Sequence, residues 1–402
     1  MTWDLLLAGG EPFDVAVQDG LIAATGPDLP RGDARTVVDV GGLLVTPGLV
    51  DLHTHVGPGY WGIEPDPIAW RTGVTTWVDA GTAGAYTLDG LLRKSFDVRV
   101  AGLLNISAVG LSGRTGESRD LANCDVALAI DTVQQHRDRI VGIKVRIDRE
   151  TVGEHGVAPL RRALAVGDAC GVPVMAHVGA APPAVDEVLE LLRPGDIVTH
   201  CASGIASPVG PAAVAAGERG VLFDLGHGSG GFAFDILERQ LDLGLRPHTI
   251  STDLHARSVL GPVFDLPTTM AKMLAAGLAL AEVIAAVTVR PAAALGLDAG
   301  TLDVGRPADL AIFAIEHGEF EVTDAHLAAR ISPMRLVNVA TYRQGQPLPA
   351  RLPAPPAPWI PLTGAQRAAL QRRDRDLRAL LNQPLVGKDG LADQFPREIR
   401  SE

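Results

Sequence analysis

The chain has 402 residues, a formal net charge of −12 and 47% hydrophobic residues. This length exceeds what a single core usually holds, so a large domain with a smaller satellite is expected. The acidic balance, without clustered Lys and Arg, argues against a nucleic-acid partner and leaves small molecules as the expected ligands. The three cysteines, at positions 124, 170 and 201, lie far apart. No disulfide framework is predicted, and a reducing compartment fits.

The first residues carry no basic region, and the apolar run at 5–8 is far shorter than a signal or membrane segment. We therefore expect a cytoplasmic protein with no membrane partner.

Residues 1–47 consist of short β-type segments separated by turns such as Asp19-Gly20 and Gly41-Gly42. From residue 48, apolar β-rich runs alternate with helix-length stretches, a pattern typical of an α/β fold with a parallel sheet. Eight such runs are predicted as strands: 48–55, 74–82, 98–107, 140–147, 172–179, 196–203, 221–228 and 249–256. Their number and spacing favour a (β/α)₈ TIM barrel, with a doubly wound open sheet as the alternative.

A helical region at 266–297 follows the eighth run, and strand patterns return at 309–315 and 334–343. Neither end of the chain has enough strands for independent stability, so we expect a composite β-sandwich. The predicted organisation is therefore a composite domain from 1–47 plus 300–350, a barrel from 48–299, and a Pro-rich extension with a C-terminal helix in 351–402. The helix, at 363–382, is expected to dock on its own barrel. A subunit contact is the alternative, which leaves formation of a homo-oligomer open.

Polar residues end several of the apolar strands. In a TIM barrel these positions surround the active site. The residues are His53, His55, Lys144, His177, His200 and Asp253. Each alone would be an ordinary core, capping or surface residue, but six such residues at the same end of five strands predict a metal centre. His53 and His55 are two apart in one strand, so both imidazoles can project to the same face.

Lys144 is unusual among these six residues, because an ammonium group beside divalent cations is electrostatically unfavourable. Burial and the cations favour the neutral amine. A neutral amine can react with carbon dioxide to give a carbamate, whose two oxygens can bridge two metals.

The ordered set of these residues resembles the amidohydrolase superfamily with a binuclear centre. The resemblance rests on 47–55 (PGLVDLHTH), on the later Lys, His, His and Asp residues in that order, and on 305–310 (GRPADL), which is similar to the return into that superfamily's β-domain. The segments 79–85, 226–234 and 251–255 resemble a deacetylase branch that includes D-acetyl-α-hydroxycarboxylate deacetylases.

The resemblance implies two divalent cations, with zinc expected. His53, His55 and Asp253 would hold the more buried ion, while His177 and His200 would hold the other. Carbamylated Lys144 would bridge them. A metal-bridging hydroxide would be the nucleophile, and Asp253 would move the proton to the leaving group.

Five further residues are predicted to contact the substrate: Arg146, His227, Gly228, Thr82 and His255. Arg146 follows Lys144 by two, so it can share the inward face and bind a carboxylate, with a salt bridge to a carboxylate at the barrel rim as the alternative. His255 could equally cap a helix.

The expected reaction is hydrolysis of an ester or amide bond in a small substrate that carries a carboxylate, as in a deacetylase. One alternative is a cyclic amidohydrolase of the dihydroorotase or hydantoinase kind. Against it, the residues 56–59 (VGPG) lack the basic residue those enzymes usually carry after His-X-His. The other alternative is a non-catalytic assembly protein on the same barrel, which would be expected to have lost ligands.

Overall fold

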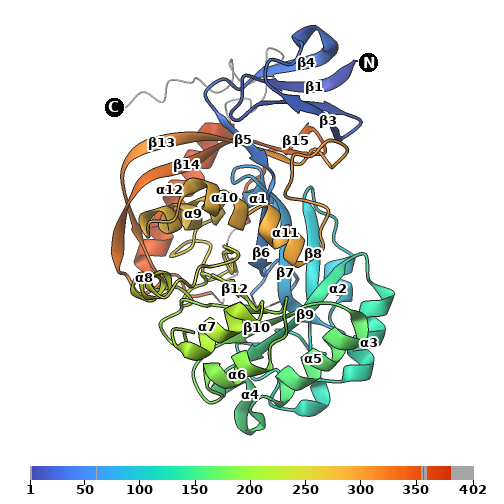
Figure 1. Ribbon diagram of the computed structural model, residues 1–402, viewed down its shortest axis with the longest axis vertical. Helices are drawn as coiled ribbons and strands as arrows, with labels where there is room; N and C mark the ends of the chain where they lie inside the picture. The colour runs from blue at the N-terminus through green and yellow to red at the C-terminus, as the bar shows by residue number, and fades with distance from the viewer. Residues whose placement is uncertain (1, 60, 355, 357–359, 382–402) are drawn as a thin grey trace.

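The computed structural model describes residues 2–59, 61–354, 356 and 360–381. Its largest sheet is parallel and curled, with seven strands in the order β12-β11-β10-β9-β8-β7-β6 (Figure 1). The strands are β6 (Leu49–Thr54), β7 (Val74–Gly84), β8 (Arg99–Asn105), β9 (Ile140–Ile147), β10 (Val174–Val178), β11 (Ile197–Thr199) and β12 (Leu222–Asp224). Seven of the eight predicted runs therefore form strands in the expected order, which confirms the α/β class.

The prediction of a regular eighth strand at 249–256 was wrong. This segment makes only isolated parallel bridges, one from Thr249 to Asp224 and one from Leu254 to Thr54. It lies between the two edges of the curled sheet, since Leu225 N donates to Thr249 O at 3.1 Å and Asp253 N to His53 O at 2.7 Å. Asp253 has φ +48°, which interrupts the extended backbone that a regular ladder requires.

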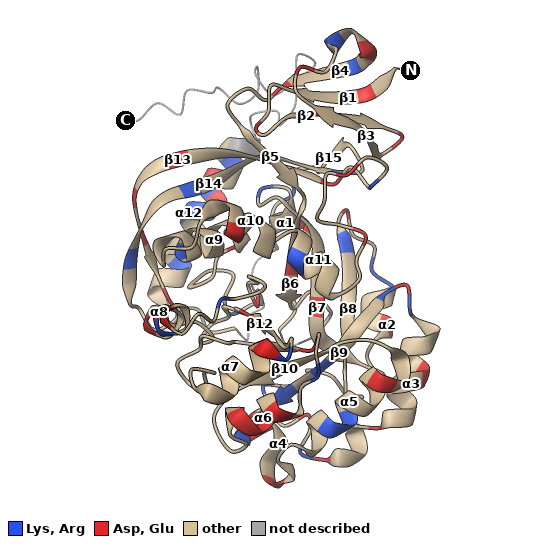
Figure 2. Cartoon of the chain, viewed as in Figure 1, with Lys and Arg blue, Asp and Glu red and all other residues tan. Residues whose placement is uncertain are grey.

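Helices cover the outer face of the sheet, as expected where parallel strands are joined by crossovers (Figure 1). The helices of this part of the chain are α1 (Asp66–Ala69), α2 (Asp89–Leu92), α3 (Val126–Gln135), α4 (Arg149–Val152), α5 (Ala158–Cys170), α6 (Val185–Leu191), α7 (Pro211–Glu218), α8 (Phe234–Asp242), α9 (Leu266–Ala275), α10 (Leu280–Ala286) and α11 (Val289–Ala294), of which α9 packs on the hairpin formed by β13 (Leu310–Thr323) and β14 (Ala329–Arg343). Figure 2 shows charged residues on α3, α5 and α6, while their apolar residues pack in the main core against the strands.

A separate apolar cluster fills the inside of the curl. Leu52, Val78, Leu103, Met175 and Ile197 come from five of the seven strands of the curled sheet and are almost fully buried. Because side chains alternate along a strand, this inner cluster and the helix-facing core can be built from the same strands. The inner cluster gives the polar residues at the strand ends a rigid base.

Two four-stranded sheets lie at the other end of the molecule. One has the order β3-β2-β1-β4 and the other β15-β14-β13-β5. Their strands are β1 (Trp3–Ala8), β2 (Asp14–Gln18), β3 (Leu21–Gly26), β4 (Ala34–Asp39), β5 (Leu44–Pro47), β13 (Leu310–Thr323), β14 (Ala329–Arg343) and β15 (Gln346–Pro347). β5 pairs with β13, and residues from both ends of the chain share one hydrophobic cluster. Strands from the two ends of the chain therefore pack together in this part of the molecule.

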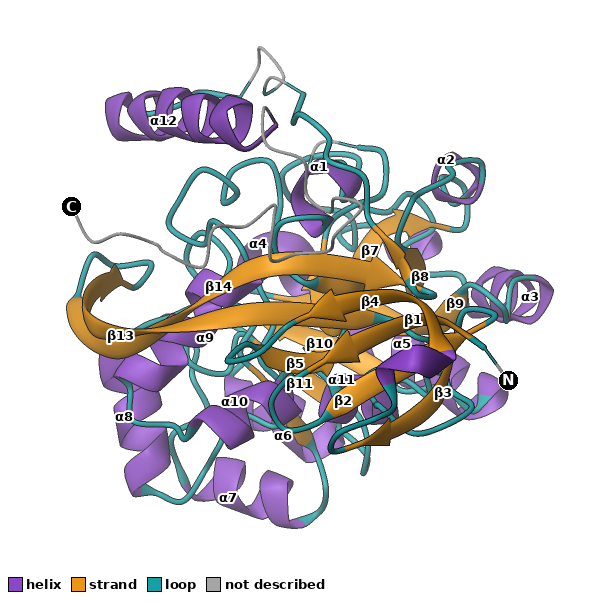
Figure 3. Ribbon diagram, turned by 90° about the horizontal axis from the view of Figure 1, so that it is seen from above, coloured by secondary structure: helices purple, strands orange, loops and turns teal. Residues whose placement is uncertain are grey.

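The β13–β14 hairpin is much longer than the patterns at 309–315 and 334–343 indicated. Its outer part extends along the helical side of the molecule (Figure 3). There Arg330 pairs with Glu238 on α8 at 2.8 Å, and Asp324 accepts a hydrogen bond from the backbone of Phe234 at 2.9 Å. Only the base of the hairpin belongs to the two-sheet unit, because its tip contacts α8 instead.

The C-terminal helix α12 (Gly364–Leu381) packs on its own chain. Leu377 is buried in the main core, and Arg373 Nη1 donates to Val259 O at 2.6 Å. Residues 382–402 of the predicted tail lie outside the described residues. Among the described residues, no helix combines the length and apolarity needed to cross a membrane.

Candidate metal centre

Three side chains converge at the carboxyl edge of the curled sheet. His53 and His55 come from the end of β6 and its following residue, and Asp253 comes from the irregular segment beside it. One potential ligand atom from each lies within 4.8 Å of the others. Asp253 Oδ1 is 3.1 Å from His55 Nε2 and 3.4 Å from His53 Nε2. This clustering is the one expected of residues that share a cation.

The donor set fits a metal ion. Within the described part of the chain, Asp253 Oδ1 is a buried oxygen without a hydrogen bond. A buried carboxylate oxygen without a donor is costly unless a cation or another partner satisfies it. Imidazole nitrogens and a carboxylate oxygen are also the ligands that zinc prefers.

Hydrogen bonds fix the tautomer of His53. Its Nδ1 lies 2.8 Å from Thr199 Oγ1, whose single proton is donated to Asp224 Oδ2 at 2.7 Å. The hydroxyl can therefore only accept from His53, so Nδ1 carries the proton and the lone pair of Nε2 faces the cluster. Asp224 is buried and also accepts from Thr249 and Ser251, both at 2.8 Å.

The neighbouring histidines are oriented in similar ways. His200 Nδ1 donates to Gly226 O at 2.5 Å, which leaves its Nε2 as an acceptor. His55 Nδ1 lies 2.9 Å from Thr82 Oγ1. The rings of His177 and His200 pack edge to face with centroids 4.4 Å apart, and the centroids of His53 and His200 are 5.2 Å apart. The structure therefore brings all four predicted histidines into one continuous group.

Lys144 lies beneath this group. Its buried Nζ is 3.0 Å from His53 Nε2 and 3.2 Å from Met175 Sδ. Burial lowers the pKa of Lys144 from 10.5 to about 7, although Asp253 and Asp224 act in the opposite direction. A substantial fraction of the amine is thus neutral near pH 7, the form that carbamylation requires.

Burial disfavours the charged form of His53, His177 and His200. Burial lowers the pKa of His200 to about 4 and that of His53 and His177 well below the ordinary value. Burial alone would raise the pKa of Asp253, but facing His53 and His55 hold it well below its usual range. Neutral imidazoles around an ionised carboxylate are the protonation states that metal ligation needs.

Two glycines allow the backbone to approach these ligands. Gly81, at φ +75°, faces Lys144, and a Cβ there would lie 2.6 Å from the lysine Cβ. Gly228, at φ +51°, faces Asp253, and a Cβ there would lie 2.3 Å from Oδ2. Glycine is required at both positions, by conformation and by space.

Arg146 forms the salt bridge that was the alternative to substrate binding. Its Nε lies 2.5 Å from Glu117 Oε1 and its Nη2 2.7 Å from Glu117 Oε2. The same Nη2 donates to Arg114 O at 3.2 Å. A role toward a substrate carboxylate stays a prediction, and a substrate would share the guanidinium with Glu117.

The other predicted substrate residues mostly serve internal contacts. Thr82 supports His55, and Gly228 packs against Asp253. His227 is fully buried, with Nδ1 donating to Gly228 O at 2.9 Å and Nε2 2.7 Å from Lys272 Nζ.

His255 lies beside the candidate metal centre. Its Nδ1 accepts from Arg257 N at 3.1 Å, so its proton is on Nε2, and its ring packs against Trp61 with centroids 4.8 Å apart. The ring also lies 6.1 Å from that of His55. Of the four, His255 is therefore the best placed to donate to a substrate.

Sequence reasoning missed the residues that orient the ligands. Asp224, Thr199 and Lys272 were not singled out, although each makes a contact described above. Asp79, in the middle of β7, accepts from the backbone of Val56 and Gly57 at 2.9 and 2.7 Å and so fixes the chain after His55. A polar residue inside an apolar strand, as in 221–225 (VLFDL), was the available signal.

A curled parallel sheet with histidines and an aspartate gathered at its carboxyl edge is the architecture of a metal-dependent hydrolase. Residues 233–340 match the model of the amidohydrolase family. A deacetylase of Agrobacterium fabrum is 37% identical over 77% of this chain and 79% of its own length. A deacetylase of Enterococcus faecalis is 34% identical over 86% of this chain and 99% of its own.

Solved structures agree. A crystal structure of an adenine deaminase superposes with a TM-score of 0.81 at 34% identity, covering 86% of this chain and 99% of the other. A crystal structure of a dihydroorotase gives 0.76 at 33% identity, covering 85% and 98%. The chain belongs to the amidohydrolase family, and these neighbours imply the TIM-barrel fold.

Proposed function

We propose that this amidohydrolase is a deacetylase-type enzyme that cleaves an ester or amide bond in a small substrate carrying a carboxylate. The observation that carries the proposal is the convergence of His53 Nε2, His55 Nε2 and Asp253 Oδ1. The identity to the two bacterial deacetylases, over most of the chain, supports the reaction class.

In this proposal His53, His55 and Asp253 would hold one divalent cation, and His177 and His200 would hold a second. Lys144, once carbamylated at its buried amine, would be a ligand to both, and the 249–256 segment would take the place of the eighth strand of a (β/α)₈ barrel. Zinc is the cation that this donor set suits best. When bound, the cations supply polarisation of the scissile carbonyl and an activated water.

Asp253 moves the proton. Its Oδ1 lies next to the two imidazoles and is ionised, so it has a lone pair with which to accept a proton from the attacking water. The glycine at position 228 leaves the space that Oδ2 occupies, which a Cβ there would fill. The protonated carboxyl then delivers the proton to the leaving oxygen or nitrogen, which makes Asp253 base and acid in turn.

The remaining polar groups receive the substrate. His255 offers an Nε2–H next to the centre, and Arg146 offers a guanidinium on the strand that carries Lys144, stabilised by Glu117. A positive group beside the centre favours substrates with a carboxylate near the scissile bond. O-acetyl hydroxy acids and N-acetyl amino acids meet this description.

The test is a substrate panel on the purified, metal-loaded protein. It contains O-acetyl hydroxy acids and N-acetyl amino acids of both configurations, together with cyclic ureides. We expect turnover of an acetylated carboxylate. Asp253→Asn should lower kcat by at least about 10²-fold, while the control Asp186→Asn, an exposed carboxylate on α6, should not. Equal activity of Asp253→Asn and the control would remove the aspartate from the mechanism.

A cyclic amidohydrolase is the second candidate, favoured by the structural likeness to the dihydroorotase. Turnover of a cyclic ureide without turnover of any acetylated acid would select it over the deacetylase. A non-catalytic protein is disfavoured, because the whole ligand set is present. If the metal-loaded protein turned over none of the substrates, a non-catalytic function would be favoured.

A further inference from the structure

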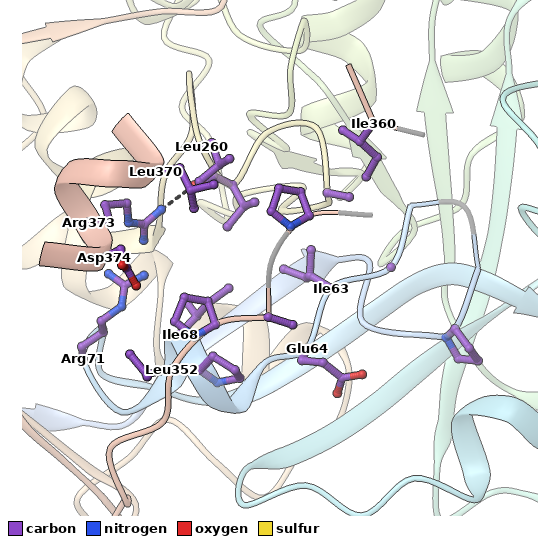
Figure 4. Close-up of a pocket in the computed structure, with 18 of the residues that line it drawn as sticks. Ile63, Glu64, Ile68, Arg71, Leu260, Leu352, Ile360, Leu370, Arg373 and Asp374 are labelled. Atoms are coloured by element: carbon purple, nitrogen blue, oxygen red, sulfur yellow. Dashed lines mark hydrogen bonds between the residues drawn. The ribbon is translucent and has the colours of Figure 1, made fainter. Parts of the chain in front are cut away.

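A cavity of about 750 Å³ lies between the sheet end and the C-terminal helix α12 (Figure 4). Its walls come from the residues after β6 at 57–59 and 62–64, from the end of α1, from 256–260, from 352–354 and from α12. None of the six proposed metal ligands lines it. Its volume is that of a typical small-molecule site.

Two arginines from two different parts of the chain line this cavity. Arg71 follows α1, and Arg373 belongs to α12; Figure 4 shows both on the same side of the pocket. Arg373 Nη1 donates to Val259 O at 2.6 Å, and Arg71 Nη1 lies 3.8 Å from Asp265 Oδ2. Within the described residues, Arg71 Nε and Arg373 Nη2 are buried nitrogens with no hydrogen-bond partner.

Nearby carboxylates do not fully balance the positive charges of the two arginines. Burial and the neighbouring Arg373 lower the pKa of Arg71 to about 10, with only Asp265 acting in the opposite direction. The same Asp265 is the facing carboxylate for Arg373 as well. It is itself shared, because its Oδ1 caps α9 by accepting from Thr268 N at 2.9 Å and Thr268 Oγ1 at 2.6 Å. Two guanidinium groups therefore face one shared carboxylate.

The other charges around the cavity are already paired. Lys94 pairs with Glu64, and Arg378 with Asp374 at 3.0 Å. The remaining wall is largely apolar, formed by Ile63, Ile68, Leu260, Leu352 and Leu370 among others. The cavity therefore has positive charge at one side and hydrocarbon at the other.

We propose that this cavity is a second binding site, distinct from the metal centre, for an amphipathic organic acid. Its carboxylate would accept hydrogen bonds from the guanidinium groups of Arg71 and Arg373, which line the cavity, and its hydrocarbon body would lie along the apolar wall. A planar guanidinium binds a carboxylate well, and an anion here removes the repulsion between the two arginines. This second site does not depend on the proposed reaction.

The test is isothermal titration calorimetry of the full chain with decanoate, and with decanol as the uncharged partner of equal length. We expect one decanoate per chain and at least about 10-fold weaker binding of decanol, since the alcohol cannot satisfy the arginines. This comparison needs no variant. Equal affinity for both compounds, or no saturable decanoate binding, would overturn the proposal.

Variants locate the site. Arg373→Gln and Arg71→Gln should each weaken decanoate binding at least about 10-fold, while Arg378→Gln, an exposed arginine that also lines the cavity, should leave it unchanged. Binding should persist after chelator treatment. If it were instead abolished by the chelator and unaffected by Arg373→Gln, decanoate would occupy the metal centre, which would contradict a second site. Turnover is not measured, so the outcome is separate from that of the substrate panel.

Discussion

Thr199→Val tests whether the metal centre depends on the hydrogen-bond chain behind His53. The hydroxyl accepts from His53 Nδ1 at 2.8 Å and donates to Asp224 Oδ2 at 2.7 Å. Valine keeps the shape and removes both bonds, so the imidazole is free to adopt the other tautomer. Loss of such a partner lowers metal affinity by about 10- to 100-fold.

The matched control is Thr249→Val. Thr249 also donates to Asp224, at Oδ1 and 2.8 Å, and is equally buried, but it does not touch His53. Both variants should lose about 1–3 kcal/mol of stability, because each deprives a buried carboxylate of one donor. Only Thr199→Val should also lose metal affinity.

The assay has two parts. Urea denaturation gives the free energy of unfolding of each variant, and zinc titration against a competing chelator dye gives metal affinity. We expect Thr199→Val to be destabilised at least as much as Thr249→Val, because it also leaves His53 Nδ1 without an acceptor, and its zinc affinity to be lower by 10-fold or more, about 1.4 kcal/mol or above. Equal zinc affinities in the two variants would refute the tautomer argument.

Two further predictions concern charged groups near the centre. Arg146→Met should lower kcat/KM for carboxylate substrates by about 2–4 kcal/mol in transition-state terms and leave a neutral aryl acetate almost unaffected; equal losses on both would assign Arg146 and Glu117 to the scaffold. Burial lowers the pKa of Lys272 from 10.5 to about 7, against opposing Asp265 and Asp324. The unfolded chain then holds the extra proton between these values, so stability relative to Lys272→Met should rise by about 2 kcal/mol from pH 7 to 9 in urea titrations. A flat difference would mean that the amine next to His227 stays charged.

The clustering of the six proposed ligands could be predicted from the sequence because five of them lie in, or directly after, strands whose order was predicted. β6, β9, β10 and β11 follow the predicted order, and parallel strands bring their carboxyl ends to one edge. The contact between Lys144 and His53 spans 91 residues of sequence and was still anticipated.

The orienting network could not be predicted in the same way. Whether Thr199 reaches His53, 146 residues away, depends on side-chain direction and on the tilt of neighbouring strands. Nothing in the local pattern distinguishes a hydroxyl that bonds a histidine from one that bonds its own backbone.

The missing eighth strand has a local cause. Residues 249–253 (TISTD) have β-type character, which favoured a strand, but Asp253 takes a left-handed conformation that turns its carboxylate toward the histidines. Strain of this kind is found at functional sites, where surrounding contacts hold the residue in place. Those contacts include the bond from Asp253 N to His53 O.

Metal stoichiometry of active protein tests the central claim most directly. Wild-type protein and Lys144→Ala are each dialysed in metal-free buffer. Elemental analysis then measures the number of bound ions per chain, and the activity of the same sample is measured beside it. We expect about two divalent ions per wild-type chain, and a parallel loss of metal and activity in Lys144→Ala because the bridging group is gone. Full activity in wild-type protein that contains no metal would contradict the account.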